Sequence, residues 1–403
     1  MKGNYFMKVL FISAGDYKYG APKSMFELIV SLKNAYGVEP VLLTKKHNEL
    51  NDKCNMLGIE NYSFWSRDIM AGSAYRNPVL NMMKQCVKFC LYIWGGMTVR
   101  WQINRMGIDF SSIDIIHTNL NRNDIGCYIS KKYNIPHIWH LREIGGKDYK
   151  ICAYKTDVIG YMNKNADHFI AISETVRRAW AERGLDDRKV KVIYNGLNVS
   201  CFKQRKEQKH IADQIKIVMT GRIEPFKGQD QLIKAVGALP DEIKGRISVD
   251  LYGEAYRDYK NYLIKYIQKM ELEDIVHFCG YCDHVPEMLA EYDIGIVASK
   301  AEGFGRVTAE YMLAGLMVIA SDTGANTELI DHGRNGLIYS DGDVRDLAEK
   351  IEKVIENPEL IDSTGRCARK DAEDKYDNAR YAREVHCLYE ELLGVDCGEC
   401  LMQ

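Results

Sequence analysis

The sequence predicts an α/β protein made of two doubly wound domains, each with a parallel sheet wrapped by helices. Short apolar runs alternate with longer helical patterns along the whole chain, which is typical of parallel sheets covered by helices. With 403 residues the chain is too long for one ordinary core. A polar, charged stretch at residues 203–209 separates two halves.

Six short apolar runs are predicted as strands in each half. In the first half they are residues 8–13, 39–44, 114–117, 136–140, 168–172 and 191–194. In the second half they are residues 216–220, 248–252, 276–278, 293–298, 317–321 and 336–339. Each half is therefore expected to have its own doubly wound sheet.

The domain boundary is expected near residue 200, with residues 1–200 in the first domain and 201–378 in the second. Residues 379–403 hold an amphipathic helix without a following strand, which is expected to pack back across the domain junction. In open parallel sheets ligands bind beyond the carboxyl ends of the strands. Two facing sheets would form one cleft, lined by residues that follow strands.

Composition excludes some classes of function. The formal net charge of −2 disfavours nucleic-acid binding through broad electrostatics, so phosphate binding must be local. The apolar strand at residues 9–12 leaves no room for a signal peptide. The longest uncharged apolar run, residues 89–99, is far shorter than the roughly 20 residues of a membrane-spanning helix. We expect a cytoplasmic protein.

Among the twelve cysteines, two pairs have C-x-x-C spacing: Cys279 with Cys282, and Cys397 with Cys400. The first pair lies at a predicted strand end and turn, and the second lies in the C-terminal tail. Scattered cytosolic thiols are the simpler interpretation. A zinc site built from the two distant pairs is the alternative.

Two strand ends of the first half carry candidate residues. After the first strand, Gly20 and Ala21 allow a ligand close to the backbone, but the loop lacks dinucleotide-binding G-x-G-x-x-G spacing and could be a plain strand-to-helix turn. His140 ends a strand and precedes a polar stretch, where it could donate to a sugar hydroxyl or move a proton. A structural role is the alternative for His140 and the expectation for His117 and His137.

In the second half, Arg222 and Lys227 follow the first strand, five residues apart. Arginine offers a fork for phosphate oxygens and lysine a point charge, so together they can hold a diphosphate and stabilise it as a leaving group. A solvated charged loop is the alternative.

A later strand runs into a loop with Glu302, and a helix starting near Arg306 carries Glu310 about one turn in. Carboxylates accept hydrogen bonds from sugar hydroxyls, and the N–H groups at a helix N-terminus favour a phosphate. A surface carboxylate and a first-turn helix carboxylate are the alternative. That alternative leaves the nearby Gly303 and Gly305 unexplained, so the pattern indicates a nucleotide-sugar site.

These motifs resemble those of the retaining glycosyltransferases of family 4, which have the two-domain GT-B fold with two facing Rossmann-like domains. The resemblance extends over essentially the whole chain, with several motifs in the right order. The matching segments are Asn195 with Gly196 at the end of the first domain, residues 221–228 as the phosphate-binding motif, Glu302 with Glu310 as the E-x7-E motif, and residues 324–330 and 335–337 as a later helix start and strand.

The resemblance implies how the donor is bound. Glu310 would bind the ribose hydroxyls of the nucleotide, and Glu302 would hold hydroxyls of the donor sugar. The loop from Gly303 through Phe304 to Gly305 would approach the donor with its backbone N–H groups.

The resemblance also implies the catalytic set: His140, Glu302, Arg222 and Lys227. Arg222 and Lys227 would hold the diphosphate, and His140 would contact the donor sugar near the acceptor. The family usually needs no metal, because such cations take over the leaving-group charge, so neither metal nor cofactor is expected. The departing phosphate helps to deprotonate the acceptor, which makes Glu302 a less secure covalent nucleophile. Many members have Gly-Gly where this chain has Gly20 and Ala21, in the loop expected to approach the acceptor or a phosphate.

Residues 65–108 carry six basic residues against one acidic residue, interleaved with aromatic and apolar residues. Basic amphipathic segments can lie on anionic membrane surfaces. Our hypothesis is a peripheral membrane contact that presents a lipid-linked acceptor. The alternative is a helical pair whose apolar face belongs to the first domain's core. The charged residues are Arg67, Arg76, Lys84, Lys88, Arg100 and Arg105, with Asp68.

Together these features predict a retaining, metal-independent hexosyltransferase that moves a sugar from a nucleotide-diphosphate sugar to a glycan or lipid-linked acceptor, in cell-surface polysaccharide or glycolipid assembly. UDP is the preferred nucleotide because it is common in the family, and GDP is second. A nucleotide-sugar epimerase of the same fold and a catalytically silent nucleotide-sugar-binding subunit are the alternatives.

Overall fold

The computed structural model describes residues 7–17, 20–66, 68–72, 78–145, 151–205 and 214–395. The chain forms two compact units. The first unit consists of Met1–Gly196 with Asn378–Gln403, and the second is Leu197–Asp377. The chain passes from the first unit to the second after Gly196. This point lies before the polar stretch at residues 203–209, which we expected to separate the two halves. The start of that stretch lies in the second unit, where Arg205 is buried.

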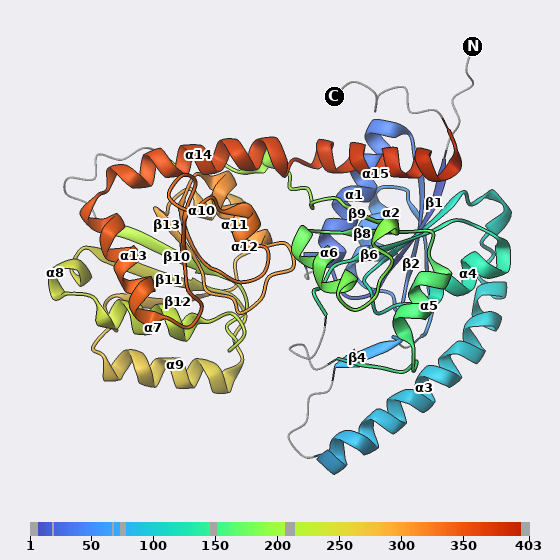
Figure 1. The fold of residues 1–403 in the computed structure, drawn as a ribbon, viewed down its shortest axis with the longest axis horizontal. Helices are drawn as coiled ribbons and strands as arrows, with labels where there is room; N and C mark the ends of the chain where they lie inside the picture. Colours follow the sequence, from blue (N-terminus) through green and yellow to red (C-terminus); the bar gives the residue numbers. More distant parts are fainter. Residues whose placement is uncertain are drawn as a thin grey trace. The chain divides into compact units, whose positions relative to one another are not determined.

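Among the described residues, the first unit is built on a seven-stranded parallel sheet in the order β3-β2-β1-β5-β6-β8-β9 (Figure 1). A short antiparallel pair, β4 with β7, lies outside this sheet. The strands are β1 (Lys8–Ser13), β2 (Glu39–Thr44), β3 (Glu60–Ser63), β4 (Met70–Gly72), β5 (Ile115–Asn119), β6 (His137–Leu141), β7 (Ile151–Ala153), β8 (His168–Ala171) and β9 (Val190–Val192).

Alternate residues of β1 point to opposite faces of this sheet, as the period of two in a strand requires. Val9 and Phe11 pack in a core shared with α1 and α15, whereas Leu10 and Ile12 pack in a core reached by the end of α3. The last helix, α15, thus returns to cover the first sheet beside α1 (Figure 1). The helices are α1 (Gly20–Tyr36), α2 (Glu49–Met56), α3 (Pro78–Arg105), α4 (Ile125–Tyr133), α5 (Val158–Asn165), α6 (Glu174–Ala181) and α15 (Asn378–Leu393).

The second unit has a parallel sheet of six described strands in the order β12-β11-β10-β13-β14-β15. Its strands are β10 (Ile215–Thr220), β11 (Ile247–Tyr252), β12 (Val276–Gly280), β13 (Ile294–Val297), β14 (Met317–Ser321) and β15 (Leu337–Tyr339). Its helices are α7 (Gln229–Ala238), α8 (Asp241–Lys244), α9 (Arg257–Lys269), α10 (Val285–Leu289), α11 (Arg306–Ala314), α12 (Asn326–Leu329), α13 (Val344–Glu356) and α14 (Glu359–Lys375). Each unit is therefore a Rossmann-like α/β domain, as the sequence predicted.

The structure differs from the sequence-based expectations at a few elements. The edge strand β3 was not predicted, because its sequence, Glu-Asn-Tyr-Ser, lacks an apolar run. α1 begins at Gly20. Gly20 and Ala21 therefore belong to its first turn and do not lie in the preceding loop. α3 is one continuous helix of 28 residues and not a helical pair.

Candidate functional site

The candidate site of the second unit forms because β10 and β13 are neighbouring parallel strands. Their carboxyl ends lie at the same edge of the sheet, so the loops that follow them meet. The backbone N–H of Lys300 donates to the carbonyl of Phe226 at 3.0 Å, which joins the two loops. Across this junction Lys227 Nζ lies 2.6 Å from Glu302 Oε1. The structure thus brings together two of the predicted site residues.

Two glycines make this close approach possible. Gly228 precedes α7 at φ +76°, and a Cβ there would lie 2.1 Å from the carbonyl oxygen of Ala298. A Cβ on Gly324 would lie 2.2 Å from the carbonyl oxygen of Glu302. A side chain at either position would push the loops apart, because interiors have no room for such overlap.

The loop that carries Glu302 is also held by residues that follow β14. The N–H of Ala325 donates to the carbonyl of Glu302 at 2.8 Å, and Thr323 Oγ1 donates to the carbonyl of Ser299 at 2.5 Å. Phe304 is buried, with its ring 5.5 Å from the ring of Tyr376 in an edge-on contact. The Phe304 side chain is therefore part of the core, which leaves only the backbone of the predicted Gly303–Gly305 segment for a ligand.

Glu310 lies in the second turn of α11, whose N-cap is Gly305. Its Oε1 pairs with Arg306 Nε at 3.0 Å, and 14% of its side chain is exposed, so the carboxylate remains reachable. The next residue, Tyr311, is buried, accepts a hydrogen bond from the N–H of Thr220 at 2.6 Å and lies 3.1 Å from Thr220 Oγ1. Burial raises the pKa of Tyr311, so the phenol keeps its proton.

Tyr311 therefore ties the helix that carries Glu310 to the end of β10. Sequence reasoning missed this residue. The available signal was Gly295 inside a predicted strand, because a Cβ there would lie 2.3 Å from the Tyr311 ring.

Arg222 has a different carboxylate partner from Lys227. Its Nη2 lies 3.1 Å from Glu224 Oε1, and Nη1 lies 3.4 Å from the hydroxyl of Tyr256. The side chain is 48% exposed, so its fork can exchange Glu224 for another anion. The amide of Gln229 donates to the Arg222 carbonyl at 2.9 Å and fixes the backbone at this point.

In the first unit, His140 lies at the carboxyl end of β6 and is fully buried. Its Nδ1 lies 3.0 Å from Nε2 of His117, on the neighbouring strand β5. No group of the described residues hydrogen-bonds to its Nε2. Burial lowers the pKa of His140 well below its usual value, and the positive charge of Arg142 lowers it further. The ring is therefore neutral.

His137, on the same strand, is structural as predicted. Its Nδ1 lies 3.0 Å from the carbonyl oxygen of Asn165 and its Nε2 lies 2.9 Å from Thr118 Oγ1, so both ring nitrogens have partners. Burial lowers its pKa to about 4.

Arg142 is a buried residue of this edge that sequence reasoning did not single out. Its guanidinium donates to Asn119 Oδ1 at 2.7 Å, Ser24 Oγ at 3.1 Å and the Tyr381 hydroxyl at 3.1 Å. It also contacts Asn195 Oδ1. One cation thus joins β5, α1, α15 and the segment at Asn195, a convergence that no local pattern reveals.

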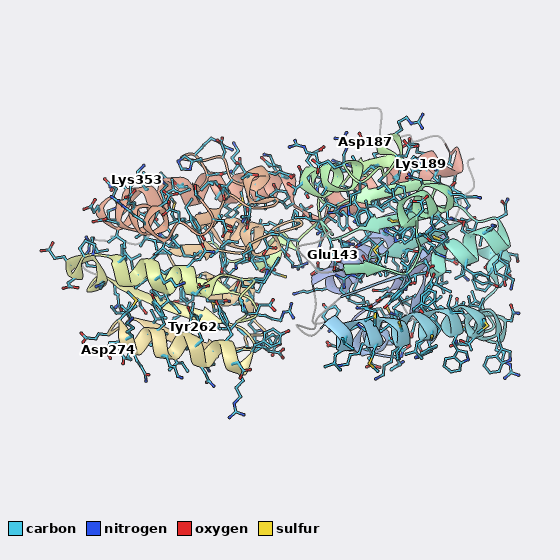
Figure 2. The ribbon with its side chains drawn as sticks, turned by 60° about the horizontal axis from the view of Figure 1, so that its bottom comes forward. Glu143, Asp187, Lys189, Tyr262, Asp274 and Lys353 are labelled. Carbon is cyan, nitrogen blue, oxygen red and sulfur yellow. The ribbon has the colours of Figure 1, made fainter. Side chains whose placement is uncertain are left out.

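Nearby, two more contacts order the same edge. Ala21 in the first turn of α1 accepts a hydrogen bond from Asn119 Nδ2 at 3.1 Å. Glu143 (Figure 2) pairs with Arg122 at 2.7 Å and joins the segments that follow β5 and β6. The predicted residues Gly20, Ala21 and His140 all belong to the first unit.

Metal ligands do not gather in the part of the chain that the structure describes, where no group of three or more His, Cys, Asp or Glu side chains could hold an ion. Cys279 is a free, exposed thiol and Cys282 is a free, half-buried one. Cys397 and Cys400 lie outside the described residues.

Two family models match the sequence, one in each half. Residues 202–371 match the model described as glycosyl transferases group 1, and residues 86–200 match the model described as glycosyltransferase family 4. The first match contains all of the candidate residues of the second unit.

Individual proteins resemble the chain over most of its length. An uncharacterised glycosyltransferase of Methanocaldococcus jannaschii is 28% identical over 326 residues, which cover 79% of this chain and 86% of the relative. The N-acetyl-alpha-D-glucosaminyl L-malate synthase of Bacillus anthracis is 21% identical over 71% of this chain and 76% of its own. Among solved structures, Anabaena HepE in complex with UDP has a TM-score of 0.77 at 21% identity, with 96% of this chain and 100% of that chain covered. The complex of HepE with UDP-glucose has a TM-score of 0.74, again at 21% identity, over 96% and 100% of the two chains.

Proposed function

Because the chain belongs to the group 1 glycosyl transferases and has their GT-B fold, we propose that it transfers a sugar from a UDP-sugar to a glycan or lipid-linked acceptor with retention of configuration. The observation that carries this proposal is the junction of Lys227 and Glu302 between two strand ends, beside the helix of Glu310. HepE, which shares the fold, was solved with UDP and with UDP-glucose, which supports UDP as the nucleotide. The product would enter a cell-surface polysaccharide or a glycolipid.

Each carboxylate in this proposal has a distinct task. Glu310 accepts hydrogen bonds from the ribose hydroxyls, with Arg306 keeping its carboxylate oriented at 3.0 Å. Glu302 accepts hydrogen bonds from the sugar hydroxyls, because its loop is held in place by Ala325. The first turn of α11 contributes N–H groups and the positive end of the helix dipole for the diphosphate.

Two cations carry the charge that develops on the leaving group. Lys227 and Arg222 each face one carboxylate in the free protein. A diphosphate offers more negative charge than either partner, so both cations can turn to it and stabilise it as it departs. These cations perform the task that a divalent ion performs elsewhere, and we propose transfer without a metal.

Glu310→Gln is expected to raise the dissociation constant for UDP about tenfold, because a neutral amide accepts hydrogen bonds from the ribose less strongly than a carboxylate. Isothermal titration calorimetry with UDP measures this dissociation constant. Glu349→Gln is the matched control, since Glu349 pairs with Arg345 at the same i,i+4 spacing and the same 3.0 Å on the exposed face of α13. Equal UDP affinity in the wild type and Glu310→Gln would remove Glu310 from the nucleotide site.

Product analysis tests the reaction itself. Incubation with a panel of UDP- and GDP-sugars and lipid-linked acceptors is expected to release UDP only when an acceptor is present, with the glycosylated acceptor found by mass analysis. Anomer assignment of that product by NMR tests retention. Epimerisation of the nucleotide sugar without acceptor would overturn the proposal, and binding without turnover would indicate a silent subunit.

We also propose that α3 rests on an anionic membrane surface, where it presents the lipid-linked acceptor. The 28 residues of α3 include four basic residues and no acidic residue. Figure 2 shows side chains projecting along its length. One apolar stripe repeats at alternate spacings of three and four residues and is exposed throughout: Leu80, Met83, Val87, Cys90, Trp94, Met97 and Trp101.

An anionic lipid surface fits this stripe better than a second copy of the helix does. Two such helices would bring only positive charges together, whereas anionic lipid headgroups attract each lysine or arginine by about 1 kcal/mol. Tryptophan is enriched at membrane interfaces, and Trp94 and Trp101 both lie on the stripe. In the described residues, no helix meets the length and hydropathy needed to cross a bilayer. Arg67 and Arg76 of the predicted basic set lie outside the described residues.

Flotation with liposomes tests this surface. The wild type is expected to float with vesicles that contain phosphatidylglycerol and to remain behind with phosphatidylcholine alone. Trp94→Glu with Met97→Glu is expected to weaken flotation at least tenfold, because two charges enter the apolar stripe. Met56→Glu is the control, since Met56 is an 85% exposed methionine on α2. Absence of flotation in every case, or dimerisation of the wild type that the double variant abolishes, would reject the membrane surface.

A further inference from the structure

The first unit contains a cavity of about 510 Å³ at the edge of its sheet opposite to His140. Three of its lining residues, Pro136, Asp167 and Lys189, each directly precede one of the neighbouring strands β6, β8 and β9. The cavity therefore lies at the amino ends of these strands, whereas His140 lies toward the carboxyl end of β6. The last turns of α4 and α5 and Leu392 of α15 complete its lining. Every lining residue belongs to the first unit.

The lining carries more positive than negative charge. Lys131, Lys164 and Lys189 line the cavity, and Asp167 is the single lining carboxylate among the described residues. Asp167 already accepts the backbone N–H of His137 at 2.8 Å through Oδ2, which holds the carboxylate against the start of β6. The three lysines outnumber this carboxylate, so an anion that enters the cavity meets an excess of positive charge.

One of the three ammonium groups is fixed in place. Lys189 (Figure 2) donates through Nζ to the carbonyl oxygens of Asn163 at 2.9 Å and Ala166 at 3.0 Å, at the end of α5. An ammonium has three N–H donors, so one donor of Lys189 remains for a ligand. The side chains of Lys131 and Lys164 are exposed, and their ammonium groups have no hydrogen-bond or ion-pair partner within the described ranges of the chain. Their charges are therefore free to bind an anion.

Lysines in the last turn of a helix also stabilise the helix dipole, which by itself would account for Lys131 on α4 and Lys164 on α5. The same unit has two further last-turn lysines, Lys132 on α4 and Lys33 on α1, and neither lines the cavity. The dipole accounts for all four positions equally. It does not explain why two of them line one cavity with the fixed ammonium of Lys189.

The size and the lining of the cavity indicate the class of ligand. Small-molecule sites are typically about 300–1,000 Å³, so this cavity has room for more than an inorganic ion. Ile135, Pro136 and Leu392 supply an apolar wall beside the lysines, and Ser130 and Asn134 add neutral polar groups. A phosphate monoester carries a charge of about −1.5 to −2 at neutral pH and offers three strong acceptor oxygens. That charge matches an excess of lysines over carboxylates.

We propose that this cavity binds a soluble organic phosphate. The phosphate monoester is held by Lys131, Lys164 and Lys189, and the carbon skeleton lies against the apolar wall. This site is distinct from the nucleotide-sugar site proposed for the second unit, and the inference does not depend on that proposal.

Isothermal titration calorimetry of the full chain with ribose 5-phosphate as the probe is expected to give a dissociation constant of about 1 mM or tighter. Ribose, inorganic phosphate and succinate each lack one part of the ligand and should bind at least about tenfold more weakly. Saturating UDP should leave the affinity for ribose 5-phosphate unchanged. Absence of binding at about 10 mM, equal affinity for succinate or inorganic phosphate, or competition by UDP would overturn the inference. Tighter binding of dihexanoyl phosphatidic acid, which carries the same group on a lipid, would overturn a soluble ligand.

Lys131→Met with Lys164→Met is expected to raise the dissociation constant for ribose 5-phosphate at least about tenfold, because methionine keeps an apolar stem and removes the charge. Lys33→Met with Lys132→Met is the matched control, since it removes two last-turn lysines of the same unit outside the cavity. The control should change the dissociation constant by less than about twofold. Equal weakening in the two double variants would show that only the overall charge matters, and the cavity would not be the site.

Chemical labelling locates the site in the wild type, so this test does not depend on the folding of a variant. The aldehyde of pyridoxal 5′-phosphate condenses with a lysine amine with loss of water, and borohydride reduces the resulting imine to a stable amine. Peptide mass mapping should find the label on Lys131 or Lys164, and excess ribose 5-phosphate should suppress it. Label spread evenly over surface lysines, or label at these two residues that ribose 5-phosphate does not suppress, would contradict the assignment.

Discussion

Lys227→Ala is expected to lower kcat/KM for sugar transfer by about 100- to 1,000-fold, the usual cost of removing one group that stabilises developing charge. The lysine lies 2.6 Å from Glu302 at the junction of the β10 and β13 loops. Its loss leaves the departing diphosphate with less positive charge and also leaves Glu302 without its cation. Because the charge develops in the transition state, kcat should fall more than KM rises.

The measurement is the initial rate of UDP release with a working donor and acceptor. Lys350→Ala is the matched control, because Lys350 belongs to the same unit and pairs with Asp346 at 2.9 Å on α13, outside the β10 and β13 loops. That variant should keep kcat/KM within about twofold, as expected for a partly exposed i,i+4 ion pair. If Lys227→Ala, folded as judged by circular dichroism, retains more than about a third of kcat/KM, the leaving-group role is wrong.

Arg205→Met is expected to destabilise the second unit by about 3–5 kcal/mol, the range for breaking a buried ion pair. Arg205 Nη1 lies 3.4 Å from Asp293 Oδ1, and Nη2 contacts Asp362, with side-chain exposures of 4%, 5% and 20% for the three residues. Methionine fills similar space but leaves two carboxylates without their cation. Asp293 is additionally fixed, because Oδ2 accepts the N–H of Lys216 at 2.9 Å, so it cannot turn to water.

Calorimetric unfolding tests this effect, with UDP added in a second series to identify the transition of the nucleotide-binding unit. Arg345→Met is the control, since Arg345 is 89% exposed and should change stability by no more than about 0.5 kcal/mol. The triple variant Arg205→Met with Asp293→Asn and Asp362→Asn should be more stable than Arg205→Met alone, because no buried charge remains. An unchanged transition in Arg205→Met would show that the pair does not support the unit.

Strands with a continuous apolar run were predictable. β1, β2 and β14 were predicted with the bounds that the structure shows, since parallel strands covered on both faces are continuous apolar runs. The polar edge strand β3 and the short pair β4 with β7 lack that signal. Arg222, Lys227, Glu302 and Glu310 were predicted to lie at one edge of the second sheet because loops after parallel strands have a known direction. The i,i+4 spacing of Arg306 and Glu310 permits their pairing, but the pairing of Lys227 with Glu302 joins two separate loops and could not be read from spacing.

The order of strands and helices, the fold of each half and the types of residue at the strand ends follow from local patterns, because burial on both sides of a sheet selects apolar runs and turns select glycine. The helix that α15 packs against does not, since an amphipathic pattern shows which face is buried but does not identify α1 as its neighbour. The same holds for Arg142 and for the contact between the Tyr389 hydroxyl and His117 Nδ1, which join residues up to 272 positions apart. Contacts between such distant residues depend on how the helices pack, and packing is decided by the shapes of all the surfaces that meet.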